Sequence, residues 1–336
     1  MAMNDMTSMD EILVSVYCLS YNHEKYIKNA LEGFVNQKTS FRYEVFVHDD
    51  ASTDRTREII EEYANRYPDI IRPLFQTENQ YSRGIRISST YIFPRMKGKY
   101  IAVCEGDDYW CSVDKLQKQV DVLEANPDIS ACVHQTLELN CKTGDKRNMC
   151  PYSVSQDVNI EDVIQGGGVV FHLSSLMYRR QYLLGQPAFC SSIKDVGDYP
   201  LAIYLALKGR IYYINETMSV YRVFSSDFSW TSVNFKENDK LRWLENWKQV
   251  ITMLKMADEY SNYKYHDEFA KVIVKYEFKI DVESRGKLVL FLPRYQSIRN
   301  EHKGIRRVKW MILFFLPSQM AELLRKAKKS WRKSNA

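Results

Sequence analysis

Long apolar runs are absent from this chain of 336 residues, so the sequence predicts no membrane-spanning helix. The longest candidate, residues 310–316, is far shorter than the roughly 20 residues that a spanning helix needs. Residues 1–10 hold two aspartates but no basic residue and no apolar core, so we expect no signal peptide there.

Paired cysteine motifs are absent as well. The seven cysteines are odd in number and include no Cys-x-x-Cys pair, which argues against a disulfide framework or a structural zinc site. We therefore expect buried free thiols, for example at Cys104 and Cys111, and a cytoplasmic location.

Phosphate-binding signatures are also missing. There is no GxxxxGK[ST] segment, which excludes P-loop chemistry. No GxGxxG follows the first predicted strand, which argues against a dinucleotide-binding Rossmann domain.

Positive charge is concentrated at one end of the chain. The formal net charge is +5, yet residues 303–336 alone contain ten Lys or Arg residues and one Glu. An enzyme acting on nucleic acid usually carries basic residues around its working site, so we expect no nucleic-acid partner. The charged content of 26% and hydrophobic content of 45% are those of a globular protein.

Strand-like and helix-like segments alternate through the first 140 residues. Apolar runs of strand length occupy residues 12–19, 43–48, 70–75, 100–104 and 129–139, and helical periodicity follows several of them. This alternation predicts an α/β fold with a mainly parallel sheet flanked by helices. Beyond it we expect strands at 176–178 and 211–214 and helices at 198–207 and 234–285.

Pairs of carboxylates follow two of the predicted strands, at the edge where parallel sheets bind ligands. Asp107 and Asp108 would repel each other unless a cation or a sugar hydroxyl satisfies them. A divalent cation held by one or two carboxylates and by substrate phosphates is the usual solution, and a solvated acidic turn is the alternative. Asp49 and Asp50 could accept hydrogen bonds from a nucleotide, whereas helix capping would account for the nearby Asp54 and Ser52 but not for this pair.

Four segments together resemble the inverting family-two glycosyltransferases of the GT-A fold, of the bacterial surface-polysaccharide type. They are residues 14–22, 47–54, 98–110 and 115–119, and their order and spacing match the family. The resemblance implies a GT-A domain at residues 11–230. A helical extension at 231–302 and a basic amphipathic tail at 303–336 would follow it.

The resemblance also implies roles for individual residues. The nucleotide-sugar donor, most simply a UDP-sugar, would be held by Ser20, Tyr21, Asn22, Asp49, Asp50, Asn79, Arg83 and Asp107. The Tyr21 ring would lie against the uracil, and Arg86 is as good a choice as Arg83. Asp108 would bind the cofactor, Mg²⁺ or Mn²⁺, which bridges the diphosphate.

Two later segments complete the resemblance. Asp198, at the start of a predicted helix, matches the family's catalytic base, and capping of that helix is a compatible second role. Residues 221–224, Tyr-Arg-Val-Phe, match a segment in which the family carries a histidine that commonly helps to hold the metal or the diphosphate. Phe224 replaces that histidine, so His172 or a water would have to take its place.

The tail has the pattern of a basic amphipathic helix. Its apolar stripe consists of Met320, Leu323, Leu324, Ala327 and Trp331. Such a helix suits an anionic membrane surface, and packing on the domain with a solvated basic face is the alternative.

The sequence thus predicts a metal-dependent inverting glycosyltransferase with a saccharide or lipid-linked acceptor. We expect it to act in capsule-like or O-antigen-like polysaccharide synthesis, at the inner face of the cytoplasmic membrane. The alternatives are a nucleotidyltransferase, which would need a glycine-rich basic loop after the first strand, and a non-catalytic sugar-binding protein.

Overall fold

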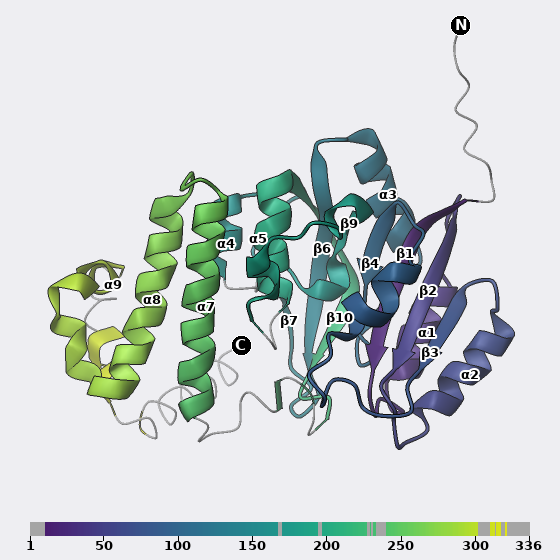
Figure 1. Ribbon diagram of the computed structural model, residues 1–336, viewed down its shortest axis with the longest axis horizontal. Helices are drawn as coiled ribbons and strands as arrows, with labels where there is room; N and C mark the ends of the chain where they lie inside the picture. The colour runs from purple at the N-terminus through teal and green to yellow at the C-terminus, as the bar shows by residue number, and fades with distance from the viewer. Residues whose placement is uncertain are drawn as a thin grey trace, which may run out of the picture.

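The computed structural model describes residues 11–166, 170–193, 197–226, 229, 231–232, 240–301, 310–312, 314–316 and 320. Within them a mixed sheet of ten strands forms the centre of the molecule (Figure 1). The strands are β1 (Ile12–Ser20), β2 (Arg42–Asp49), β3 (Ile71–Phe75), β4 (Tyr100–Val103), β5 (Tyr109–Trp110), β6 (Ile129–Asn140), β7 (Lys146–Asn148), β8 (Gln156–Val158), β9 (Met177–Arg179) and β10 (Arg210–Val223).

The strand order is β3-β2-β1-β4-β9-β6-β10-β5, with β7 beside β6 and β8 beside β10. β1, β2, β3 and β4 pair in parallel, as do β6 and β10. β9 lies between β4 and β6 and is antiparallel to both. The carboxyl ends of β1, β2 and β4 therefore meet at one side of the sheet, which we call the carboxyl edge.

Helices cover both faces of the sheet (Figure 1). They are α1 (Ile27–Val35), α2 (Thr56–Arg66), α3 (Lys115–Ala125), α4 (Ile160–Gly166), α5 (Asp198–Lys208), α7 (Lys240–Tyr260), α8 (His266–Arg285) and α9 (Gln296–Asn300). Short helical segments are η1 (Ser88–Ile92), η2 (Phe93–Arg95), η3 (Leu173–Ser175), η4 (Arg180–Tyr182), η5 (Ala188–Ser191), η6 (Lys287–Phe291) and η7 (Pro293–Tyr295).

Alternate residues of the central strands face two separate cores. Val14 and Val16 point to the core that α1, α2 and α3 cover, and Tyr17 points to the other core. α4, α5, α7 and the first turns of α8 cover that second core. Since both faces are buried, the strands need the continuous apolar runs that the sequence contains.

The structure confirms the predicted α/β fold class and the helical C-terminal region, with two differences in detail. The helical region is broken at residues 261–265, where Asn262 and Tyr263 have left-handed backbone conformations. β10 is much longer than the predicted strand at 211–214 and extends to Val223. The domain boundaries at 230 and 302 stay predictions, because both residues lie outside the described ranges.

Two expectations concern thiols and membranes. All seven cysteines are free, and Cys104 is buried as expected. The expectation for Cys111 is wrong: this residue is exposed, because it follows β5, the last strand in the sheet order. Across the part of the chain that the structure describes, no helix combines the length and apolar character needed to cross a membrane.

Candidate active site

The loops after β1 and β2 are joined at the carboxyl edge. The Ser20 hydroxyl donates to the backbone carbonyl of His48 at 2.9 Å. Beyond the strand ends, the backbone N–H of Asn22 donates to Ser52 Oγ at 2.9 Å. Asn22 has a φ of 54°, a left-handed conformation that asparagine adopts more readily than most residues. Between these anchored positions the Tyr21 side chain is 36% exposed and free to contact a ligand.

The carboxylates of Asp49 and Asp50 are buried and engaged by their own loops. Asp49 accepts hydrogen bonds from the hydroxyl and the backbone N–H of Ser52. Asp50 accepts from the backbone N–H groups of Gln80 at 2.8 Å and Tyr81 at 3.0 Å. The pair therefore shapes the loops of the site, and direct reading of a base by these side chains stays a prediction.

The loop after β3 carries the other residues that the resemblance selects. The Asn79 side chain donates to the backbone carbonyl of Asp50 at 3.4 Å, so it lies at the carboxyl edge. Arg83 lies in an exposed ion pair with Glu78 of the same loop, at 2.9 Å. Arg86 instead donates to backbone carbonyls of the segment before α5, which leads to the predicted base.

Asp107 and Asp108 follow β4 and are held by the end of β10. The backbone N–H of Arg222 donates to Asp108 Oδ1 at 2.8 Å, and Asp108 is 1% exposed. The Arg222 guanidinium donates to the backbone carbonyl of Asp107 at 2.7 Å. The Ser225 hydroxyl donates to Asp107 Oδ2 at 2.8 Å. Both aspartates are thus positioned by residues more than a hundred positions later in the chain.

Glycines allow close approaches at both ends of β4. A Cβ on Gly98 would lie 2.3 Å from the backbone nitrogen of Ser15 in β1. A Cβ on Gly106 would lie 2.8 Å from Nδ1 of His23. Gly98 therefore lets the chain before β4 lie against the backbone near the start of β1, and Gly106 lets the loop that carries the aspartates lie close to the His23 side chain.

Arg222 is a site residue that the sequence analysis missed. It is 8% exposed, and its guanidinium lies over the rings of Tyr26 at 4.9 Å and Tyr109 at 4.5 Å. It also donates to Asn29 Oδ1 at 2.8 Å. An arginine packed between aromatic faces keeps its charge and fixes its planar fork of donors. The available signal was one arginine within the apolar Tyr-Arg-Val-Phe segment.

Phe224 stands where the family carries a histidine, and His172 is the candidate to replace that histidine near the aspartates. Phe224 has a left-handed φ of 58°, and Lys142 Nζ lies 4.8 Å from its ring centroid. His172 is close to the aspartates, with Nδ1 at 3.8 Å from Asp108 Oδ2. Its ring stacks on Tyr221 with centroids 3.9 Å apart. Burial lowers the pKa of His172 to about 3, so this imidazole is neutral at physiological pH.

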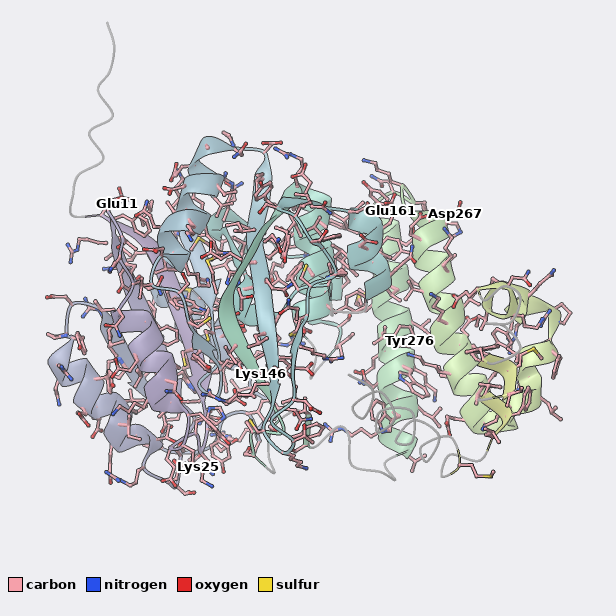
Figure 2. All side chains as sticks on the ribbon, turned by 180° about the vertical axis from the view of Figure 1, so that it is seen from behind. Glu11, Lys25, Lys146, Glu161, Asp267 and Tyr276 are labelled. Carbon is pink, nitrogen blue, oxygen red and sulfur yellow. The ribbon has the colours of Figure 1, made fainter. Side chains whose placement is uncertain are left out.

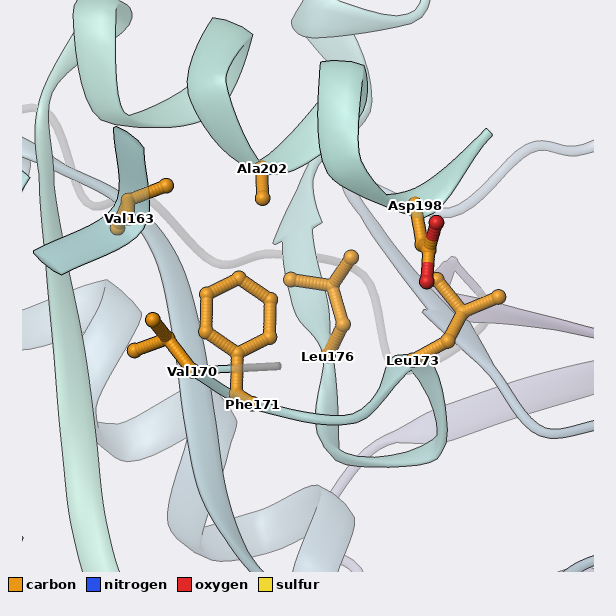
Figure 3. A pocket seen from close by; sticks show the side chains of 7 residues that line it. All are labelled: Val163, Val170, Phe171, Leu173, Leu176, Asp198 and Ala202. Atoms are coloured by element: carbon orange, nitrogen blue, oxygen red, sulfur yellow. The ribbon is translucent and has the colours of Figure 1, made fainter. Parts of the chain in front are cut away.

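Asp198 is the first residue of α5 and accepts a hydrogen bond from the backbone N–H of Tyr199 at 2.8 Å. Figure 3 shows its carboxylate at one end of a pocket whose other walls are apolar. Those walls consist of Val163, Val170, Phe171, Leu173, Leu176 and Ala202. Asp198 is exposed, yet the protein packed around its carboxylate disfavours the charged form through desolvation and raises its pKa, which makes the carboxylate a better base once deprotonated.

Negative charge accumulates where these elements meet. The pKa of Asp108 is raised by burial and by the charges of Asp107 and Glu105, with the charge of Arg222 opposing the effect. The pKa of Glu105 is raised by burial and by Asp107 and Asp198. All four carboxylates also raise the pKa of the Tyr221 hydroxyl, after the larger effect of burial. The structure therefore brings the predicted residues Asp107, Asp108 and Asp198 together, and adds Glu105.

The carboxylate cluster fits a divalent cation that takes some of its ligands from the protein and the others from a bound substrate. Among the residues that the structure describes, no three His, Cys, Asp or Glu side chains are arranged to hold a metal ion alone. A cation bound through one or two carboxylates and through substrate phosphates needs no such set. Asp108 Oδ2 is the suitable atom, because Oδ1 is engaged by Arg222. His172 Nδ1 accepts a hydrogen bond from the backbone N–H of Ser174 at 3.2 Å, which coordination would break.

A buried polar cluster around Lys115 and Gln119 connects the elements that carry the site. Lys115 donates to Gln119 Oε1 at 2.6 Å, and its Nζ lies 4.1 Å from the ring centroid of Trp110. Gln119 donates to the backbone carbonyls of Cys132 and Ser175, both at 2.8 Å. The segment at 115–119 therefore ties α3 to β6 and to the residues before β9. Burial lowers the pKa of Lys115 to about 7.

Comparison with known proteins identifies the family of the chain. Residues 15–184 match the model of Glycosyl transferase family 2. An uncharacterised protein of Mycobacterium tuberculosis is 36% identical over 211 residues, which are 62% of this chain and 58% of that protein. The chain thus spans less than two thirds of this relative. The putative teichuronic acid biosynthesis glycosyltransferase TuaG of Bacillus subtilis is 28% identical over 219 residues, covering 65% of this chain and 81% of TuaG.

Solved structures share the fold. Residues 1–349 of Staphylococcus aureus TarS, in complex with UDP-GlcNAc, superpose with a TM-score of 0.57 and 16% identity over 84% of this chain and 78% of that one. A mannosyltransferase from Pyrobaculum calidifontis, in complex with GDP-Man and Mn²⁺, has a TM-score of 0.52 and 17% identity over 96% and 83% of the two chains. The fold is that of GT-A glycosyltransferases, as the sequence predicted. With a family match over half of its length, the chain belongs to glycosyl transferase family 2.

Proposed function

We propose that the protein transfers a sugar from a nucleotide-sugar donor to a hydroxyl of a saccharide or lipid-linked acceptor, with inversion, in the synthesis of a cell-surface polysaccharide. The observation that carries the proposal is the meeting of Asp107 and Asp108 from β4 with Asp198 from α5 at one edge of the sheet. The name of TuaG gives no donor for this chain, but it supports polysaccharide chemistry.

The proposed donor is a UDP-sugar, because the TarS complex holds UDP-GlcNAc in the same fold. Tyr21 would lie against the base, since its ring is accessible between two anchored neighbours. Ser20, Asn22, Asp49, Asp50 and Asn79 would shape this pocket, and Arg83 would approach the phosphates from its exposed loop. The Asp107 carboxylate would accept a hydrogen bond from a hydroxyl of the ribose.

The chemistry assigned to the chain's own residues is acid–base and electrostatic. Asp108 would hold Mg²⁺ or Mn²⁺ through Oδ2. The bound ion would stabilise the negative charge that develops on the departing diphosphate. Asp198 would take the proton from the attacking hydroxyl on the opposite face of the sugar, which inverts the anomeric carbon. One carboxylate suffices as base, because the nucleotide diphosphate leaves without protonation by a second one.

The proposed location is the inner face of the cytoplasmic membrane, reached through the basic tail. The tail stripe from Leu323 to Trp331 lies outside the described residues, so the helix itself stays a prediction. The ten basic residues of 303–336 would be drawn to anionic lipids, and a lipid-linked acceptor is found at such a surface.

Incubation with a panel of UDP- and GDP-sugars, with and without Mn²⁺, tests the proposal by release of the nucleoside diphosphate. Release of UDP from one donor, dependent on the metal and increased by a saccharide acceptor, is the expected result. Pyrophosphate release from a nucleoside triphosphate would instead indicate a nucleotidyltransferase. Sugar binding without turnover of any donor would indicate a non-catalytic protein.

A further inference from the structure

Five large apolar side chains near the C-terminus are exposed, and they come from two segments that lie against each other. Leu288, Phe291 and Leu292, in and just after η6, are 74%, 53% and 38% exposed. Ile312 and Phe315 are 57% and 37% exposed. The rings of Phe291 and Phe315 stack with centroids 5.8 Å apart, so the two segments present one surface. We call these five residues the apolar patch.

A buried cluster holds the apolar patch in place. Val289 and Leu290, between the exposed residues of η6, pack with Phe278 of α8 in a small core of their own. Trp310 and Phe314 pack onto the same core from the second segment. The exposed side chains are therefore the outer face of an ordered element. Contiguous apolar surface of this kind on a soluble protein usually marks a contact with a partner or a membrane.

Basic residues are frequent in the stretch of chain that carries the apolar patch. Arg285, Lys287, Arg294 and Arg299 lie in the same stretch of chain, against the single acid Glu301 between residues 285 and 301. Arg285 and Arg294 are 65% and 49% exposed, and both pair with the carboxylate of Asp281. The residues that follow, 303–336, add ten basic residues and one acid. Exposed apolar side chains in a stretch with an excess of basic residues match an anionic lipid surface, where each cation contributes electrostatically and the apolar groups enter the acyl boundary.

The end of α8 that leads into the apolar patch lies toward the same side of the molecule as the carboxyl edge. In Figure 2, β1 descends from Glu11 at the top, and Lys25 lies below its end. α8 descends in the same direction from Asp267 past Tyr276, and η6 follows its lower end. The segment that carries Leu288, Phe291 and Leu292 therefore begins on the side of the molecule on which the loops of the candidate site lie.

We propose that the apolar patch inserts into an anionic membrane and turns the carboxyl edge toward that surface. The role of this insertion rests on the proposed function, since membrane binding would bring a lipid-linked acceptor to Asp198. Membrane binding itself requires neither a donor nor turnover, so it can be tested separately.

Sedimentation of the full-length protein with vesicles tests the proposal. The variant carries Leu288→Ser, Phe291→Ser and Ile312→Ser, which change exposed side chains and spare the core beneath. The matched control carries Leu184→Ser and Leu241→Ser, which are 82% and 81% exposed and lie outside the patch. The vesicles are phosphatidylcholine alone and phosphatidylcholine with phosphatidylglycerol, each at low and high salt. Circular dichroism and size-exclusion chromatography establish the fold and the oligomeric state of each protein.

We expect the triple variant to bind the anionic vesicles at least about tenfold more weakly than the wild type, while the control binds normally. The residual binding of the variant should disappear at high salt, because only charge remains to hold it. Equal binding by variant and wild type would overturn the proposal and leave the charge of the tail as the attraction. A wild-type dimer that becomes monomeric in the variant, with unchanged vesicle binding, would also overturn it and assign the patch to a second copy. UDP release in solution should be the same for all three proteins, so a failure of the proposed reaction would be seen independently.

Discussion

Arg222 and Asp108 are joined by a hydrogen bond from the backbone N–H of the arginine to the carboxylate, at 2.8 Å, while the guanidinium of the same arginine holds the Asp107 carbonyl at 2.7 Å. The end of β10 therefore sets the position of both aspartates after β4. In our proposal Arg222 contacts neither the sugar donor nor the acceptor substrate, but it positions Asp107 and Asp108, which bind the donor and its metal ion.

Replacement of Arg222 should mainly weaken donor binding. Arg222→Gln removes the charge and most of the fork of donors, so we expect kcat/KM for the donor to fall about 10²-fold, with Arg222→Lys intermediate. Steady-state kinetics at several Mn²⁺ concentrations measure this, and the variant should need more metal. Arg210→Gln, on the same strand but paired with Asp128 and Asp157, is the control and should leave donor KM unchanged. If Arg222→Gln lowers only the melting temperature, the arginine is merely structural.

Asp108→Asn should abolish metal-dependent binding of UDP. The amide keeps an acceptor for the Arg222 N–H but loses the charge that a hard cation requires. Calorimetric titration with UDP, with and without Mn²⁺, measures the effect. Asp128→Asn, a carboxylate paired with Arg210 at a distance from the site, should behave like the wild type. Unchanged affinity in the Asp108 variant would remove this residue from the metal site.

Asp198→Asn should preserve donor binding and reduce turnover by about 10²-fold or more, the usual contribution of a positioned base. The carbonyl of the amide can still accept from the Tyr199 N–H, so the start of α5 should remain intact. In the wild type, a base must be deprotonated to act, so kcat/KM should fall as the pH drops through the pKa of Asp198. Because desolvation by the surrounding protein raises that pKa, the fall should occur above the ordinary aspartate value of 3.8. Near-normal turnover in the variant would leave Asp198 as a helix cap only.

Lys115→Met should change how stability depends on pH. The folded pKa of about 7 lies below the unfolded value of 10.5, so above pH 7 the unfolded chain binds a proton that the native protein releases. Wild-type stability should therefore gain up to about 1.4 kcal/mol per pH unit from this group as the pH rises from 7 to 8.5. The variant should lack that contribution. Urea unfolding of both proteins across this pH range measures the free energy of unfolding. If it changes with pH in the same way in both proteins, the lowered pKa of Lys115 is wrong.

Shortening the tail should weaken attachment to anionic membranes without affecting the reaction. Trp310 and Phe314 pack on the buried cluster of α8 and η6, so the truncated protein should end at Leu316 and keep both residues. Removal of residues 317–336 deletes six basic residues and one acid. We expect weaker, though not abolished, sedimentation with phosphatidylglycerol vesicles at low salt and unchanged UDP release with a soluble acceptor. Equal sedimentation of both proteins would indicate that these residues pack on the domain.

Much of the fold and the position of the site could be read from the chain. The apolar run at 12–19 differs from β1 by one residue, because strand periodicity is a local property of neighbouring side chains. The positions of Asp107 and Asp108 after β4, and of Asp198 at the start of α5, follow from the same local patterns. Parallel strand order then requires the residues after each strand to gather at one edge.

The contacts that give those residues their roles depended on the tertiary structure alone. No local pattern brings Arg222 to Asp108, or directs the two oxygens of Asp50 to the backbone of Gln80 and Tyr81, because each contact joins segments far apart in sequence. The raised pKa of Asp198 likewise comes from apolar walls supplied by α4, η3 and the residues around them. Composition and periodicity determine which segments form strands and helices, whereas burial, hydrogen-bond partners and pKa depend on which segments then pack together.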